Sequence, residues 1–302
     1  MSSQLTARNS LLFNASGEDL DASCVLTTAN DIIVNPKSKS IEYKEIGSGQ
    51  AGNTKSRSIV DFTTAEFSVE INAKPSGDKT KPPSYGELFK CCGLSETATD
   101  DNVTYAPATL ATGHAKAYLD GAMREITGIA GDFTFGGKVG EIAKFTFSLK
   151  GFTTLDETAE DNPDVTLDSN TNLTIESITA ITVGGNSVAM EDFEFSLGNE
   201  IQETYAIGLK EYYISDFKPT IKVNAVKTKG NSNHWKDLAS NTLKEIVVKL
   251  GEDEDGQKLE FRASYCNPSD VSESDSSGKI VYSNTWSCEN KDGGDNFSIV
   301  YS

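Results

Sequence analysis

Histidine, the residue that most often acts as a base in catalysis, is scarce in this chain of 302 residues. His114 and His234 are the only two. A serine or cysteine nucleophile needs a base placed beside it. His234 stands at the start of a predicted helix and His114 before a predicted strand, so both are interpreted as ordinary surface or capping residues.

Two other groups of residues resemble reactive or phosphate-binding sites but have the wrong spacing. The adjacent Cys91 and Cys92 point to different faces of a helix, and no CxxC is present, which disfavours zinc. Gly136-Gly137-Lys138 is followed by Val139, where a phosphate loop has Ser or Thr. A hairpin turn is the better interpretation of these glycines.

Acidic residues are abundant, but no pattern among them selects a site. The stretch 253–256 resembles a calcium loop, yet Gly251 and Arg262 occupy its first and twelfth ligand positions. A glycosidase needs two carboxylates across a cleft, and the sequence does not single out such a pair. We therefore expect no catalytic residue, no metal and no cofactor, and no enzymatic activity.

Composition narrows the class of protein further. Lys and Arg total 27 against 45 Asp and Glu, a net charge of −18, which disfavours a protein that grips nucleic-acid phosphates. No apolar stretch approaches the ~20 residues of a membrane span, and no secretory signal is visible at the N-terminus. Five cysteines at irregular spacing favour a reducing compartment.

The elements that would position any site are mostly strands. Residues 66–73 and 143–150 alternate apolar and polar side chains, as half-buried strands do. Asp120-Gly121 and Gly136-Gly137 are predicted hairpin turns. The stretch 267–278 is acidic and rich in serine, and it is predicted to be a loop.

Two short helices are predicted between the strands. Ser84 is the predicted N-cap of the first, which ends at Gly93, and Asn233 caps the second. Each carries an apolar stripe at i, i+3, i+4 and i+7 that is expected to pack on the core. The stripes are Tyr85, Leu88, Phe89 and Cys92 in the first helix, and Trp235, Leu238, Ala239 and Thr242 in the second.

The two halves of the chain follow the same order, which predicts an internal duplication. An offset of 152 places Asn72-Ala73 on Asn224-Ala225 and Glu42-Tyr43 on Glu194-Phe195, and the closing strands 145–149 and 297–301 match in kind. The polar stretch 153–164 is the predicted linker, giving domains 1–155 and 156–302. The alternative is that two β-rich halves merely look alike.

An ordered set of segments then resembles a known family. A long polar loop (46–58) precedes FTTAEFSVEINAK and PPSYGELFKCCGL, which lead to VTYAPAT, AYLDGAMREITGIAGDFTF and GEIAKFTFSLKG. Together with FEFSLGNEIQETYAIGLKEYYISDFKPTIKVNA in the second half, this order resembles the tail tube proteins (major tail proteins) of long-tailed bacteriophages. The resemblance covers about residues 24–226.

The resemblance implies a mainly β fold of two tandem tail-tube-type sandwich or barrel units, each with one flanking helix. Such proteins form rings that stack into the virion tail tube, assembled in the bacterial cytoplasm. The implied partners are the chain itself, a tape-measure protein and tail-tip or terminator proteins, while DNA passes without specific binding. Because this chain carries two units, a homotrimeric pseudo-hexamer is favoured over a true hexamer.

Two sets of residues are expected to serve a tube. One or both polar strand faces are expected to line the channel, although they would equally suit outer solvent: Glu66, Ser68, Glu70 and Asn72, and Thr220, Lys222 and Asn224. The loop 46–58 and its counterpart 198–209 are expected to join stacked rings, through Lys55, Arg57, Gly198, Asn199 and Glu200. A solvent-exposed loop without a role is the alternative for the first.

A carbohydrate-binding or adhesion module of a virion is the second class of function kept open. Acidic β-sandwiches with long loops suit that role, and exposed aromatic side chains gathered on one face would favour it. Trp235 on its helix stripe and Trp286 alone in a strand give little support.

Overall fold

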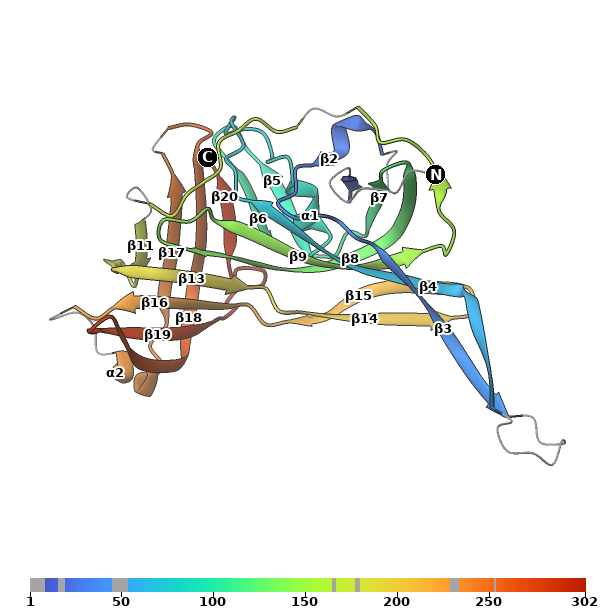
Figure 1. The fold of residues 1–302 in the computed structure, drawn as a ribbon. Coiled ribbons are helices and arrows are strands. Elements are labelled where there is room, and N and C mark those ends of the chain that lie inside the picture. Colours follow the sequence, from blue (N-terminus) through green and yellow to red (C-terminus); the bar gives the residue numbers. More distant parts are fainter. Residues whose placement is uncertain are drawn as a thin grey trace.

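The computed structural model is mainly β, with two short helices, α1 (Gly86–Lys90) and α2 (His234–Ser240) (Figure 1). It describes residues 9–15, 20–44, 54–164, 167–176, 180–228, 234–252 and 254–302. The strands of the first half are β1 (Asn9–Asn14), β2 (Val25–Leu26), β3 (Asn35–Lys44), β4 (Thr54–Asn72), β5 (Leu94–Ala98), β6 (Val103–Pro107), β7 (Gly113–Leu119), β8 (Ala122–Lys138), β9 (Lys144–Thr153) and β10 (Thr158–Ala159). Those of the second half are β11 (Ala180–Val183), β12 (Asn186–Ser187), β13 (Met190–Ser196), β14 (Asn199–Ala206), β15 (Leu209–Phe217), β16 (Thr220–Val226), β17 (Lys244–Gly251), β18 (Lys258–Ser276), β19 (Lys279–Cys288) and β20 (Ser298–Tyr301).

One antiparallel sheet runs through both halves of the chain in the order β3-β4-β9-β8-β13-β16-β19-β18. Figure 1 shows β13, β16 and β19 side by side below β8. The two long strands β8 and β18 leave this sheet at their N-terminal ends, where β8 pairs with β7 and β18 pairs with β17. They thereby form the second layer that closes the core.

The order of strands repeats between the halves. In the first half it is β1-β7-β8-β9-β4, and in the second β11-β17-β18-β19-β16. The hairpin β5–β6 belongs to the first half alone among the described residues. This order is the one that a duplicated unit would have.

Two details of the predicted alignment are wrong. The strand in the position of β9 is β19 and not β20, which pairs instead with β18 and β6. Glu42-Tyr43 lies in a projecting hairpin opposite Ser56 and Lys55, whereas Glu194-Phe195 lies in the middle of the sheet. Short identities in alternating sequences match at many offsets, so they do not fix which strands correspond.

The first helix packs as predicted. Tyr85, Leu88 and Phe89 are fully buried, and the Phe89 ring lies 4.9–5.9 Å from the rings of five neighbours. The predicted cap is wrong, because the N-cap residue is Tyr85, and the Ser84 hydroxyl donates to the Asp168 carboxylate instead. Gly93 has the predicted left-handed conformation, with φ +84°.

The second helix does not pack as predicted. The Trp235 side chain is 51% exposed, Leu238 is half-buried and Ala239 is exposed, and Thr242 lies beyond the helix end. Its expected cap, Asn233, falls outside the described residues. The helix lies at the rim of the sheet, where the Trp235 indole donates to the Glu273 carboxylate. Its apolar stripe is therefore only partly covered by other residues.

Three predicted turns and loops can be compared with the structure. Asp120-Gly121 forms the turn between β7 and β8, with φ values of +41° and +90°. Gly136-Gly137 is not a turn but lies within β8, and 267–278 is not a loop but mostly strand β18 with its turn to β19. The backbone pairing of β18 with β19 overrides the polar composition that suggests a loop.

The predicted linker 153–164 folds back on the first half. Thr158 and Ala159 pair with the start of β8, and the Tyr118 hydroxyl donates to Glu160 at 2.9 Å. The predicted linker is therefore not a loose connection over these residues.

Candidate functional site: a polar sheet face and two hairpin arms

Both predicted sets of channel residues lie on one face of the continuous sheet. Directly paired residues in an antiparallel sheet point to the same face. One row across the sheet therefore joins the two sets, from Glu70 through Thr146, Thr134, Ser196 and Thr220 to Ser287. A second row runs from Asn72 through Lys144, Gly136, Glu194 and Lys222 to Thr285 and Asp270.

The opposite face of the same strands forms the core. Its residues alternate with those of the polar rows and are buried: Phe67, Val69, Ile71, Phe133, Phe135, Phe145, Phe147, Phe193, Phe195, Ile221, Val223 and Trp286. A shift by one residue in any strand would exchange the two faces. Burial of the aromatic face therefore fixes which side chains line the polar face.

Charges on the polar face are mixed and paired. Glu66 accepts from Lys37 at 3.1 Å and lies 3.5 Å from Lys150, and Glu70 lies 3.8 Å from Lys144. The hydrogen bond from Lys37 is the main cause that lowers the pKa of Glu66 below its ordinary value. The face is therefore not uniformly acidic next to these strands, despite the strongly negative chain.

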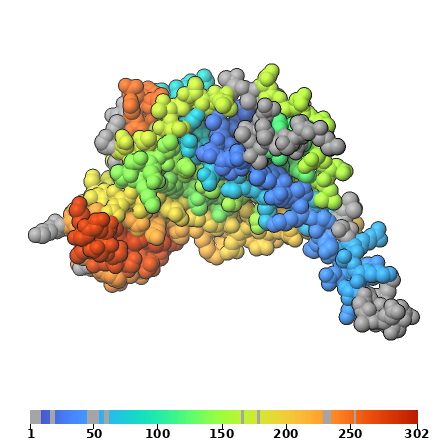
Figure 2. Space-filling view, in the orientation of Figure 1, coloured from blue at the N-terminus to red at the C-terminus, as the bar shows by residue number. Residues whose placement is uncertain are grey.

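The first arm is the outer part of the hairpin β3–β4. Lys55 and Arg57 are exposed and lie in β4, opposite Tyr43 and Ile41 of β3, and not in a loop. Residues 46–53 of the predicted ring-joining loop lie outside the described part of the chain. Figure 2 shows this arm projecting from the body of the molecule.

The second arm is the hairpin β14–β15, which covers residues 199–217 and replaces the loop expected at 198–209. It packs against the first half of the chain: the Tyr205 and Phe62 rings are 4.4 Å apart, and the Tyr212 and Phe152 rings are stacked at 4.7 Å. A groove of about 460 Å³ lies between this arm and the end of α1. In the first arm, the apolar residues Ile41 and Tyr43 are exposed.

The residues Gly198, Asn199 and Glu200 lie at the base of the second arm. Asn199 donates to the carbonyl oxygens of Cys92 and Gly131, both at 2.8 Å, and its backbone N–H donates to Asp132. Gly198 has φ +68°, which suits the bend between β13 and β14. Asn199 thus fastens the two halves together, while Glu200 is paired with Lys218 at 2.8 Å.

The sequence does not reveal the junction between β8 and β13. A Cβ added to Gly136 would lie 2.5 Å from the Phe193 carbonyl oxygen, so glycine is required by the approach of β13. Burial raises the pKa of Asp132, which accepts the backbone N–H of Asn199 at 3.1 Å. A pair of consecutive glycines in an otherwise alternating strand is the one signal that points to a close backbone approach.

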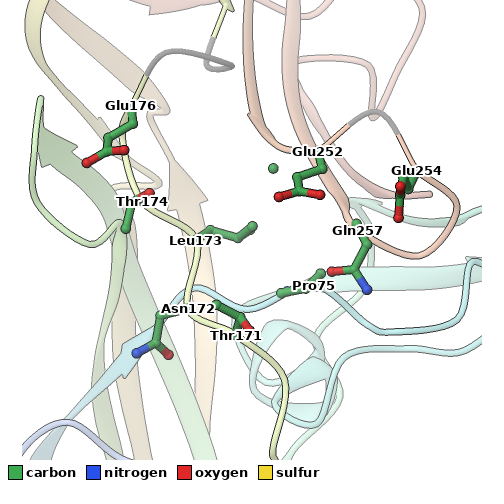
Figure 3. A pocket seen from close by; sticks show the side chains of 10 residues that line it. Pro75, Thr171, Asn172, Leu173, Thr174, Glu176, Glu252, Glu254 and Gln257 are labelled. Carbon is green, nitrogen blue, oxygen red and sulfur yellow. The ribbon is translucent and has the colours of Figure 1, made fainter.

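A second cavity lies elsewhere in the molecule. Its volume is about 390 Å³. Figure 3 shows that it lies between the segment 171–176 and the turn after β17, with Glu176 and Glu252 on opposite sides. Among the described residues, no three His, Cys, Asp or Glu side chains lie close enough to hold a metal ion. None of the described helices is long and apolar enough to cross a bilayer.

Comparison with known proteins identifies a family. Residues 21–287 match the model of a family described as "Phage tail tube protein". No curated protein matches the chain.

Proposed function

The chain belongs to the phage tail tube protein family, and from this premise we propose that it polymerises as stacked rings whose channel conducts the genome during ejection. The observation that carries the proposal is the polar face shared by seven strands of one sheet. A sheet of this width with an apolar back can form part of a barrel wall, and closure with further copies would complete it. As a structural component of the virion tail, the chain has no catalytic role in this proposal.

The repeated strand order supports a specific stoichiometry for this ring. Residues 1–155 and 156–302 are each one tube unit, so three chains supply the six units of a pseudo-hexameric ring, with a true hexamer as the alternative. Three chains would contribute about 24 strands spaced by about 4.8 Å, and tilted strands then give a barrel roughly 40–50 Å across. That width leaves room for a nucleic-acid duplex inside the side chains.

The partners in this proposal are other copies of the chain, a tape-measure protein within the tube, and tail-tip and terminator proteins at its ends. DNA passes along the polar face without specific contacts. Assembly takes place in the cytoplasm of the bacterial host. The exposed tyrosines lie on separate arms, at Tyr43 in β3 and at Tyr205 and Tyr213 in the β14–β15 hairpin, an arrangement that does not favour the carbohydrate-binding alternative.

Native mass spectrometry and negative-stain microscopy of the purified protein test the proposal together. We expect a ring mass of three chains and hollow rings or tubes. A protein that stays monomeric at high concentration would refute it, and a ring mass of six chains would replace the trimer with the hexamer.

Reversing two charges on the polar face is expected to slow genome delivery without preventing assembly. In the double variant Glu66→Lys, Glu70→Lys, both new lysines face Lys150 and Lys144, and the resulting cationic patch would hold DNA phosphates. Each exposed ion pair contributes only about 0–1 kcal/mol, so tubes should still form. We expect on the order of tenfold fewer productive infections per particle.

The matched control carries the same charge change away from this face. Asp100→Lys, Asp101→Lys alters the exposed turn between β5 and β6 and should leave infection near the wild-type level. If both double variants are equally infective, the polar face does not line the channel.

Shortening the projecting arm is expected to prevent stacking while sparing single rings. Replacing residues 46–53 by a two-residue turn keeps the described pairs of β3 and β4, up to Lys44 and Thr54. Sedimentation and microscopy should then show rings in place of tubes. Tubes of normal length from this variant would exclude an inter-ring role for the tip of the arm.

A further inference from the structure

We infer that Cys266 and Cys288 form an oxidation site, at which a peroxide joins the two thiols in a disulfide that stabilises the folded chain. The inference goes beyond the proposed tube and does not depend on it. It is carried by the position of the two thiols on directly paired strands and by the place of this pair at a corner of the fold.

The two thiols face each other across neighbouring strands. Cys266 of β18 pairs directly with Cys288 of β19, both are buried, and their sulfur atoms are 3.9 Å apart. The Glu289 N–H donates to the Tyr265 carbonyl at 2.8 Å, which makes the cysteines a non-hydrogen-bonded pair. In such pairs the Cα atoms are about 4.5 Å apart, and disulfides span Cα distances of about 4.4–6.8 Å. Rotation of the side chains is therefore enough to join the sulfurs.

Cys266 is the residue at which β18 passes from one layer of the fold to the other. It is the last residue of β18 that pairs with β17, opposite Lys244, and the first that pairs with β19. Cys288 is the last residue of β19. A bond between the two sulfurs would therefore tie the layer that contains β17 to the sheet that contains β19.

The corresponding corner of the first half is built without sulfur. There Ile126 of β8 pairs with Ala115 of β7 on one side and with Thr153 of β9 on the other. Ile126 thus has the same two kinds of neighbour as Cys266, one strand in each layer. Because this corner forms with isoleucine and threonine, its geometry does not require thiols. The paired thiols of the second half are explained by a bond between them.

The closed structure protects the thiols, so their oxidation needs local opening. The hydrogen bond with Cys288 and burial raise the pKa of Cys266, whereas the reactive form of a cysteine is the thiolate. The strand pairing around Cys266 is irregular, because β17 and β19 each shift register beside it. Cys288 is followed by the exposed residues 289–293. We therefore expect a slow reaction that proceeds when this end of β19 opens.

The reaction balances with hydrogen peroxide as the oxidant. One sulfur, as the thiolate, attacks a peroxide oxygen; an S–O bond forms, the O–O bond breaks, and the departing hydroxide takes up the thiol proton as water. The second sulfur then attacks the resulting sulfenic acid; the S–S bond forms, the S–O bond breaks, and a second water carries away the second thiol proton. The two thiols lose two electrons, and the peroxide gains them.

The disulfide closes a loop of 21 residues, 267–287. Closing a loop of this length stabilises a fold mainly by restricting the unfolded chain. For a chain of this size we expect the Tm to rise by about 5–10 °C. In the proposed function, the chain folds in a reducing cytoplasm and meets oxidising surroundings after release from the cell, so the bond would form in the assembled tube.

Peptide mapping of the folded protein after treatment with hydrogen peroxide tests the inference. Trypsin cuts after Arg262, Lys279 and Lys291, which places the two cysteines on separate peptides, 263–279 and 280–291. The remaining thiols are alkylated in denaturant before digestion. Mass spectrometry should then detect these two peptides linked, lighter than their sum by two hydrogen atoms, and a reductant should separate them. The Tm of the oxidised protein should rise and return to its first value on reduction.

Two variants serve as matched controls for the Tm. Cys288→Ala removes the bond, so peroxide should no longer raise its Tm, whereas Cys92→Ala removes a buried thiol elsewhere and should show the full rise. The peptide map uses the natural chain and decides the question even if Cys288→Ala does not fold. Absence of the linked peptides, a linkage that appears only in urea, or a Tm that does not rise overturns the inference and leaves the proposed function standing.

Discussion

Substituting valine for Gly136 is expected to break the sheet between the two halves of the chain. The new Cβ would lie 2.5 Å from the Phe193 carbonyl oxygen and 3.1 Å from the Glu194 Cα. Both contacts are with backbone, which cannot turn aside as a flexible side chain does. We expect the free energy of unfolding to fall by about 3 kcal/mol or more, because overpacking of a rigid site costs about 1–3 kcal/mol before the lost strand pairs are added.

Urea unfolding followed by circular dichroism measures this change. Thr134→Val is the matched control, since Thr134 is on the same strand and face and valine has nearly its shape. Its effect should stay below about 1 kcal/mol. If the Gly136→Val chain is as stable as the Thr134→Val chain, then β13 does not approach β8 as closely as the structure indicates.

Removing the Phe89 ring is expected to lower the free energy of unfolding by more than removing the larger Trp235 ring. Phe89 is fully buried among Tyr85, Tyr105 and three phenylalanines, and Phe→Ala in a core costs about 3–5 kcal/mol. Trp235 is 51% exposed and has one hydrogen bond, to Glu273 at 3.3 Å. Its replacement by alanine should cost about 1 kcal/mol or less.

Denaturant midpoints of Phe89→Ala, Phe89→Leu and Trp235→Ala give the comparison. Phe89→Leu refills part of the cavity and should recover more than half of the loss. Equal destabilisation by Phe89→Ala and Trp235→Ala would mean that the two helices are equally packed. That result would agree with the similar apolar stripes of the two helices and would contradict the different burial of Phe89 and Trp235 in the structure.

The two arms also have different surroundings. The β14–β15 arm rests on the first half of its own chain through Tyr205 and Tyr212. In the β3–β4 arm, Ile41 and Tyr43 remain exposed.

Sequence alone determined the fold class, the core-facing residues of the strands and the first helix. The alternation in residues 66–73 and 143–150 is a local pattern. It predicts a half-buried strand directly, because successive side chains of a strand point to opposite faces. The turn at Asp120-Gly121 was equally readable, since few residues tolerate its positive φ values.

Tertiary structure alone decided which strands are neighbours. Gly136-Gly137 has turn composition, yet these residues lie within a strand because another backbone passes beside them. Residues 267–278 have a composition typical of loops, yet most of them pair with β19 and so belong to the sheet. Trp235 is a residue type typical of cores, yet it lies at the rim of the sheet and is 51% exposed. In each case the deciding contact comes from residues distant in the chain, and no local pattern carries that information.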